Sequence, residues 1–187
     1  MSLLSRLYLA LALALPVVAL AEITEHLSYS YYELAETNSP KDLVAQLDKA
    51  SPVKYENEVL HARTDWDVDW RVEWEPSEED RCMISQIHIT VDAVILLPSL
   101  SSEDVETQQQ FNRYVRQLQV HEHGHYVIAM QAANAIVHHL QRLQGPCDLI
   151  EQQVDELAVA VLDQHTEREV RYDKTTRHGR DQDLWEW

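Results

Sequence analysis

Positive charge is scarce in this sequence of 187 residues. Lysine and arginine together number 15, against 32 aspartate and glutamate residues, so the formal net charge is −17. A surface with this excess of negative charge repels phosphate backbones and anionic lipid headgroups. The composition therefore argues against nucleic acid or an anionic membrane surface as a partner.

Long apolar runs are absent beyond the N-terminus. There, a single basic residue, Arg6, precedes an apolar run that ends in Ala19-Leu20-Ala21, the small-x-small pattern of a signal-peptidase site. We expect residues 1–21 to be a signal peptide and residues 22–187 to form one soluble domain, periplasmic or secreted, without stable membrane insertion after cleavage. The alternative is an uncleaved anchor, but the run is short for a bilayer span and Pro16 interrupts it.

Cysteine is also rare, with only Cys82 and Cys147 in the chain. Neither stands in a C-x-x-C spacing, which disfavours zinc ligation by cysteine. In an oxidising compartment each thiol has only the other to pair with, so we expect a disulfide between them. Two buried free thiols are the alternative.

Three stretches in the N-terminal half have the patterns of strands. Residues 23–34 are rich in tyrosine, isoleucine and serine, and residues 64–74 alternate tryptophan or valine with charged side chains. Residues 82–96 are rich in isoleucine and valine before Pro98. A short helix is expected after Pro40. We expect the strands to form a small antiparallel sheet.

Glycine and proline are absent between Pro98 and Gly124, and apolar residues recur there at helical spacing. This predicts one long helix that ends near Gly145-Pro146, followed by a second helix over residues 148–171 and a loop from Tyr172 onward. No internal repeat is visible. The sequence predicts one α+β domain of zincin-like arrangement, with a sheet in the first half and two helices in the second.

The segment His121-Glu122-x-x-His125 matches the H-E-x-x-H motif of zinc metallopeptidases. Residues four apart lie on one helix face, so His121 and His125 can reach one ion. Glu122 lies beside them and can act as the general base toward water on the metal. His123 points away and is expected to be exposed or behind the ligands.

A catalytic zinc site needs a third protein ligand. His138 and His139 are too far along the same helix, and His165 is expected to be a satisfied interhelical histidine. We favour His178, with Glu156 as the alternative. The full set of candidates is His138, His139, Asp155, Glu156, His165 and His178.

The chain resembles a bacterial family of secreted zinc-dependent proteases, formerly a domain of unknown function. The resemblance covers most of the chain after the signal peptide. It is carried by Tyr31-Tyr32, Leu43, Leu47, Thr64-x-Trp66, Trp70, Cys82, Leu97-Pro98, His121-Glu122-x-Gly124-His125, Cys147 and Tyr172-Asp173-x-x-Thr175-x-x-His178-Gly179. In the family's tail pattern a threonine stands two residues before the histidine, which is Thr176 here.

The resemblance implies zinc-dependent hydrolysis of a protein or peptide substrate, with His121 and His125 as ligands and Glu122 as the base. It also implies the Cys82–Cys147 disulfide. Tyr172 or Arg177, close to His178 in sequence, could stabilise the oxyanion. Two other functions are open: a non-enzymatic zinc-binding protein with an envelope partner, and a metal-dependent amidase acting on cell-wall peptides.

Overall fold

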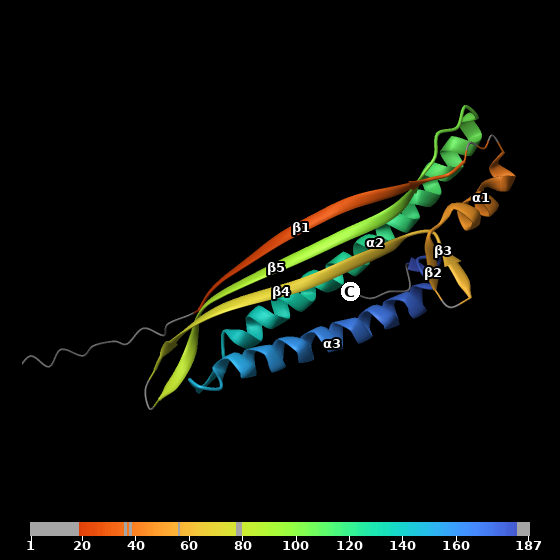
Figure 1. Ribbon diagram of the computed structural model, residues 1–187. Helices are drawn as coiled ribbons and strands as arrows, with labels where there is room; N and C mark the ends of the chain where they lie inside the picture. Colours follow the sequence, from red (N-terminus) through yellow and green to blue (C-terminus); the bar gives the residue numbers. More distant parts are fainter. Residues whose placement is uncertain (1–18, 36, 38, 56, 78–79, 183–187) are drawn as a thin grey trace, which may run out of the picture.

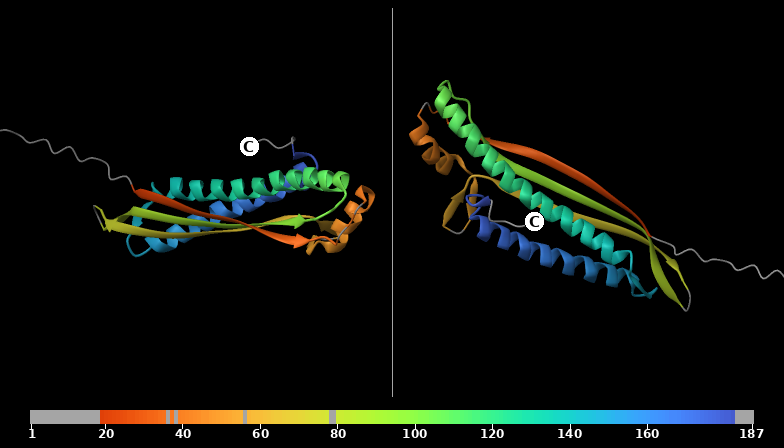
Figure 2. Two further views of the ribbon diagram at one scale, coloured as in Figure 1. Left: turned by 90° about the horizontal axis from the view of Figure 1, so that it is seen from above. Right: turned by 180° about the vertical axis from the view of Figure 1, so that it is seen from behind.

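The computed structural model describes residues 19–182 except residues 36, 38, 56, 78 and 79. It forms an elongated molecule with a four-stranded sheet, in which three strands are long, and two long helices (Figures 1 and 2). The predicted signal peptide lies mostly outside the described residues, and its expected cleavage site after Ala21 falls at the start of the first strand. No helix in the described part of the chain is long and apolar enough to cross a membrane.

The sheet is mixed and has the strand order β1-β5-β4. β4 (Arg63–Pro76) and β5 (Arg81–Ser99) are antiparallel, whereas β1 (Leu20–Glu33) pairs with β5 in parallel. The predicted α+β class is confirmed, but the sheet is not wholly antiparallel. β1 and β4 flank β5 instead of pairing with each other. The alternation of side chains within a strand does not indicate which strand lies beside it or in which direction that neighbour runs.

Small elements connect β1 to β4 at one end of the molecule. They are the 3-10 helix η1 (Pro40–Asp42), the helix α1 (Leu43–Ala50) and a hairpin of β2 (Val53–Tyr55) and β3 (Glu58–Leu60). The short helix after Pro40 is confirmed. No strand was predicted in this hairpin, because each side is only three residues long, too short for a visible alternation.

The long helix α2 covers residues Val105–Leu140 and lies across the sheet. The side chain of Asp104 caps it, accepting a hydrogen bond of 2.7 Å from the backbone N–H of Thr107. It ends earlier than expected, because Gln144–Pro146 forms a strand, β6, that pairs with the start of β5. Figure 1 shows α3, residues Ile150–Thr176, beside α2 along the β4 edge of the sheet.

The main core lies between the sheet and the two helices. Ile87, Ile89 and Val91 of β5 are at most 1 % exposed and share this core with Ile136 of α2 and Val154 of α3. Burying one such side chain contributes about 1.5–3 kcal/mol to folding. On β4 the alternation is confirmed, since its acidic residues face solvent.

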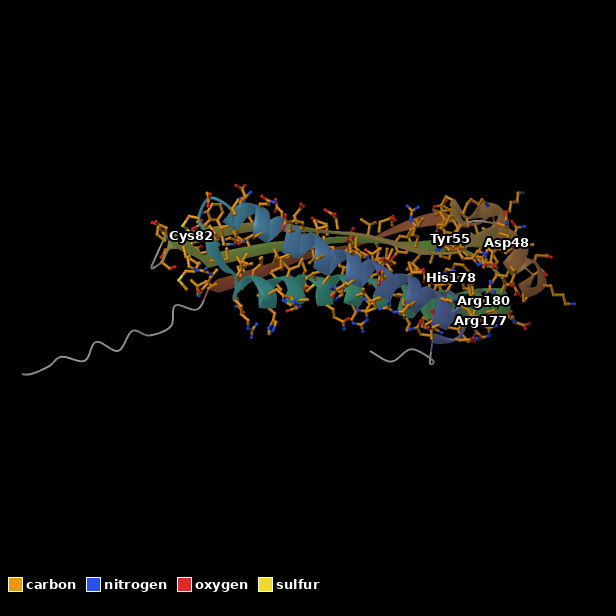
Figure 3. All side chains as sticks on the ribbon, turned by 90° about the horizontal axis from the view of Figure 1, so that it is seen from below. Asp48, Tyr55, Cys82, Arg177, His178 and Arg180 are labelled. Carbon is orange, nitrogen blue, oxygen red and sulfur yellow. A yellow bond between two sulfur atoms is a disulfide. The ribbon has the colours of Figure 1, made fainter. Side chains whose placement is uncertain are left out.

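The disulfide between Cys82 and Cys147 is confirmed. It joins the start of β5 to the segment after β6, and the two cysteines are 65 residues apart in the sequence. Figure 3 shows Cys82 at the end of the molecule opposite to His178. The covalent link therefore fastens the helix hairpin to the sheet far from the predicted site.

Candidate metal centre

The motif residues lie in the middle of α2 on the face that turns toward β4 and α3. His121, Glu122 and His125 are buried, with 2 %, 4 % and 6 % of their surfaces exposed. Such burial of three ionisable side chains is expensive unless each has partners. Their partners define the site.

Each motif histidine has a hydrogen-bond acceptor at its Nδ1 atom. His125 Nδ1 lies 2.8 Å from Glu169 Oε1, and His121 Nδ1 lies 3.0 Å from Gln182 Oε1. The indole N–H of Trp66 donates to the same Glu169 oxygen and fixes its position. With a proton held at Nδ1, the Nε2 lone pair of each ring is free for a metal ion, the arrangement usual for metal-binding histidines.

The two Nε2 atoms point at a common position, 3.3 Å from each other. Asp173 Oδ1 lies 3.1 Å from both of them, and His178 Nδ1 lies 3.5 Å from that oxygen. Ligand atoms about 2.0–2.1 Å from a tetrahedral zinc ion are about 3.3 Å apart. One ligand atom from each of His121, Asp173 and His178 lies within 4.8 Å of the others. The spacing and chemistry of these side chains fit zinc.

The end of α3 brings Asp173 and His178 to the motif. The helix stops at Thr176, after which Arg177, His178 and Gly179 have φ values of 48°, 51° and 84°. This left-handed turn folds the chain back onto α2, where a Cβ on Gly179 would lie 2.8 Å from His121 Cβ. The expected loop from Tyr172 is therefore wrong: residues 172–176 are helical, and only the turn after them leaves the helix.

Electrostatic coupling between these groups is strong. Burial alone would lower the pKa of His125, but hydrogen bonds to Asp173 and Glu169 outweigh it and raise the pKa to about 10. Burial would raise the pKa of Asp173, but its hydrogen bonds with His121, His125 and His178 hold the pKa well below the ordinary range. The site thus holds a carboxylate next to an imidazolium, and a divalent cation there would supply the positive charge in place of that proton.

Glu122 faces the same cleft as the two histidines. The hydroxyl of Thr64 on β4 lies 2.8 Å from Glu122 Oε2 and 2.9 Å from the Glu122 carbonyl oxygen, and can donate to either. Burial raises the pKa of Glu122, although the charges of His125 and His121 oppose the shift. A carboxylate with a raised pKa, fixed by one hydrogen bond, is well suited to accept a proton.

Tyr172 and Arg177 lie away from the metal position. The Tyr172 hydroxyl lies 2.9 Å from the backbone carbonyl of His121, and its ring stacks on the His121 imidazole at 4.7 Å. Tyr172 is fully buried. The Arg177 guanidinium pairs with Asp181 on the surface. These contacts place Tyr172 behind the histidines as a support and leave Arg177 outside the cleft.

The other candidate ligands are placed elsewhere. Glu156 is exposed on α3, 17 residues before Asp173 and thus about 25 Å along the helix, and it accepts a hydrogen bond from Gln152. Asp155 accepts a hydrogen bond from Trp70. His165 contacts the Val161 carbonyl. His138 and His139 lie in the last turn of α2, and His123, as expected, is exposed.

The site contains residues that the sequence motifs do not predict. Asp173, Glu169 and Gln182 surround the two histidines, and Thr64 holds Glu122. The sequence contains a pattern that points to Asp173 and Glu169. Glu169 and Asp173 stand four apart, which on a helix puts both carboxylates on one face.

The site opens into a cleft of about 800 Å³. His121, Glu122, His125 and Asp173 line its floor, and the β2–β3 hairpin and the start of β4 form the opposite wall. Tyr55 of the hairpin approaches the His178 ring, with ring centroids 5.9 Å apart. The candidate metal position therefore lies among buried side chains at an open cleft.

A comparison with protein families shows what the chain is similar to. The family described as "Bacterial protein of unknown function (DUF922)" matches residues 29–179, a span that runs from β1 to the turn after α3 and contains His121, Glu122, His125, Asp173 and His178. No curated protein and no solved structure matches the chain. The zincin-like arrangement and the protease activity stay predictions.

Proposed function

The chain belongs to this bacterial family of unknown function, and we propose that it is an exported zinc-dependent metallopeptidase that hydrolyses peptide bonds. One observation carries the proposal: the two imidazole Nε2 atoms and the Asp173 carboxylate oxygen lie 3.1–3.3 Å from one another, His178 Nδ1 lies 3.5 Å from that oxygen, and the buried carboxylate of Glu122 lines the same open cleft. A disulfide and an N-terminal signal-peptide pattern support export.

In this proposal His121 and His125 of α2 hold the zinc ion together with Asp173, which is on a rigid helix. His178 follows the helix end and has 29 % of its side chain exposed. Hydrolysis requires one position on the metal that no protein atom fills. Because His178 is the least constrained of the four, it is the side chain that leaves this position free for the substrate.

Glu122 acts as the general base. When bound, zinc lowers the pKa of water to about 7 and polarises the scissile carbonyl. The Glu122 carboxylate accepts the proton of the attacking water and returns it to the leaving amine. Thr64 holds the carboxylate in place, and Glu169 and Gln182 keep the proton on Nδ1 of the two histidines. Tyr172 positions the His121 ring by stacking.

A second function is favoured by the number of converging side chains. Four protein ligands would complete a tetrahedral zinc site, and closed sites of that kind are structural. The chain would then be a non-enzymatic zinc-binding protein of the envelope. Glu122 opposes this alternative, because a structural site has no use for a buried, raised-pKa carboxylate facing a cleft. A zinc amidase acting on cell-wall peptides would use the same residues and differ only in substrate.

Replacing Glu122 by glutamine tests the proposal. The amide fills the same volume but cannot accept a proton, so we expect the zinc content to stay at that of the wild type and peptide hydrolysis to fall by about 10²–10⁴-fold. Metal analysis and cleavage of a peptide mixture, followed by mass spectrometry, give both values.

The matched control is Glu156→Gln, which makes the same chemical change on the exposed face of α3 and should leave both values unchanged. Wild-type protein that carries one zinc ion but cleaves neither proteins nor cell-wall peptides would refute the enzymatic proposal and favour the closed site. Near-normal cleavage by Glu122→Gln would remove Glu122 from the mechanism.

A further inference from the structure

The cleft extends beyond the metal centre to a second group of hydrogen-bonded side chains. His61 Nε2 lies 2.8 Å from Asp48 Oδ1, and His61 Nδ1 lies 2.6 Å from the hydroxyl of Tyr114. The Tyr32 hydroxyl donates to the His61 carbonyl at 2.9 Å. These bonds tie α1, the segment before β4 and α2 together around one imidazole. His61 and Tyr114 both line the cleft, and neither has a part in the proposed hydrolysis.

The hydrogen bonds assign the proton positions of this group. A carboxylate only accepts, so His61 carries a proton at Nε2 and donates it to Asp48. In the neutral ring Nδ1 then accepts from Tyr114. The donors of both rings are thus used within the group, and a ligand at this end of the cleft must be bound by another donor. Burial raises the pKa of Tyr114, and the charge of Arg180, which also lines the cleft, opposes this shift.

Two of the cations that line the cleft have no ion-pair partner among the described carboxylates. The carboxylates that line it are those of Glu122, Glu169 and Asp173, and all three are hydrogen-bonded. Its cations are Arg63, which pairs with Asp65, and Lys174 and Arg180. No carboxylate of a described residue lies within 4.0 Å of the side-chain nitrogens of these last two. Both side chains are exposed, so they lie at the surface of the cleft, where they offer positive charge in a chain with a net charge of −17. The charge of Arg180 also acts on Asp181.

From these contacts we infer that the end of the cleft beside Tyr114 is a subsite for a substrate carboxylate. Arg180 binds this carboxylate, and the Asp48–His61–Tyr114 group forms the rigid wall of the subsite. The guanidinium offers a planar fork of N–H donors that matches a carboxylate. Figure 3 shows Asp48, Tyr55, His178 and Arg180 together at this end of the molecule. The inference rests on the proposed peptidase function and names its substrate class: peptides that carry a carboxylate near the scissile bond.

The helix sets the distance between the two parts of the cleft. Tyr114 precedes His121 by seven residues on α2, which is about 10 Å along the helix axis. An extended peptide rises about 3.3 Å per residue, so the carboxylate would lie about three residues from the bond that is cut. It can belong to the C-terminus of the peptide or to an aspartate or glutamate side chain.

The test compares four mixtures of random decapeptides: C-terminal acids or amides, each with or without aspartate and glutamate. Zinc-loaded protein should cleave the carboxylate-containing mixtures about 10- to 100-fold faster than the mixture with none, the range of a charge-assisted hydrogen bond. Cuts should fall about three residues from the carboxylate. A preference for the acid form identifies the C-terminus as the source, and a preference for aspartate or glutamate identifies the side chain.

Arg180→Gln should reduce this ratio of rates to near one. The matched control is Arg177→Gln, three residues earlier in the same turn, whose guanidinium pairs with Asp181 outside the cleft and whose loss should leave the ratio unchanged. Equal rates on all four mixtures by the wild type would overturn the subsite and leave the peptidase proposal intact. So would an unchanged ratio in Arg180→Gln.

A binding measurement separates the subsite from the activity. The zinc-loaded Glu122→Gln protein is titrated calorimetrically with a decapeptide from each mixture, with and without Arg180→Gln. Tighter binding of carboxylate-bearing peptides that depends on Arg180 supports the subsite even if the wild type cleaves nothing. Equal binding of all four peptides overturns it.

Discussion

Asp173 connects the three histidines of the candidate metal centre. One of its carboxylate oxygens contacts the ring nitrogens of His121, His125 and His178, and no other described side chain reaches all three. A hard, anionic oxygen among imidazoles also distinguishes the site from an all-histidine one. Its position on a helix gives it a fixed direction, whereas His178 lies in the turn that follows and has 29 % of its side chain exposed.

The first residue-level prediction ranks the ligands. Asp173→Ala removes a rigid ligand, so zinc affinity should fall by more than 100-fold, whereas His178→Ala should weaken it by about 10- to 100-fold, as for a residue that supports the site. Glu156→Ala serves as the control and should have no effect. Competition with a chelator of known affinity measures all three. If His178→Ala proves the more damaging, the third permanent ligand is His178, as the sequence predicted.

At this scale the sequence predicts the motif but not its surroundings. The spacing of His121, Glu122 and His125 carries its own geometry, because a helix places residues four apart on one face. His178 is brought to the site as expected. Asp173 and Glu169 stand four apart, but other acidic pairs of α3 have the same spacing, and only the way α3 packs against α2 selects this pair.

The turn after α3 is the element that joins the site together. Gly179 has a φ of 84°, where a side chain is strained, and its Cα faces the Cβ of His121. The Gln182 side chain, three residues later, accepts from both His121 and Tyr172. A displacement of this turn would therefore move His178 and loosen the His121 ring at the same time.

Gly179→Ala should disturb both stability and metal binding. The strained φ and the contact at 2.8 Å together should lower the free energy of unfolding by about 1–3 kcal/mol, and zinc affinity should fall because His121 shifts. Gly145→Ala is the control, since its Cβ would meet only the flexible end of Gln153. Urea unfolding and chelator competition measure the effects. An unchanged zinc affinity in Gly179→Ala would show that the turn does not hold the site.

The elements differ in how far their sequence predicts them. The start of α2 and the alternation of β4 follow from local patterns. The last helical turn of α3 was missed because Tyr172, Asp173 and Thr176 face the histidines instead of the apolar core, so the hydrophobic period fades while the helix continues. The parallel pairing of β1 with β5 depends on the path of the whole connection, which no local pattern records.

For the molecule as a whole, the disulfide lies at one end of the elongated fold, and the candidate metal centre lies away from it toward the end that carries α1 (Figure 3). The Cys82–Cys147 bond fastens β5 to the helix hairpin, whereas the other end is held by hydrogen bonds and by contacts of α1 with α2. Stability and metal binding should therefore be separable by mutation.

Replacing both Cys82 and Cys147 by serine should lower the free energy of unfolding by about 4 kcal/mol, the chain-entropy value for a loop of this length. Zinc affinity under native conditions should stay within about threefold of the wild type, because the ligands are remote from the bond. Urea unfolding and chelator competition again give the two values. A large loss of zinc affinity in the fully folded double variant would show that the disulfide contributes to the geometry of the site.

The proposed zinc ligands come from α2 and from the end of α3, so they are synthesised at different times. His121 leaves the ribosome 61 residues before Gln182, which at about 5–20 residues per second corresponds to roughly 3–12 seconds. Asp173, His178 and Gln182, which is the acceptor for His121, are added only in the last ten residues of that interval. In the proposed function, a complete zinc site and the hydrolysis that depends on it therefore require the chain through residue 182.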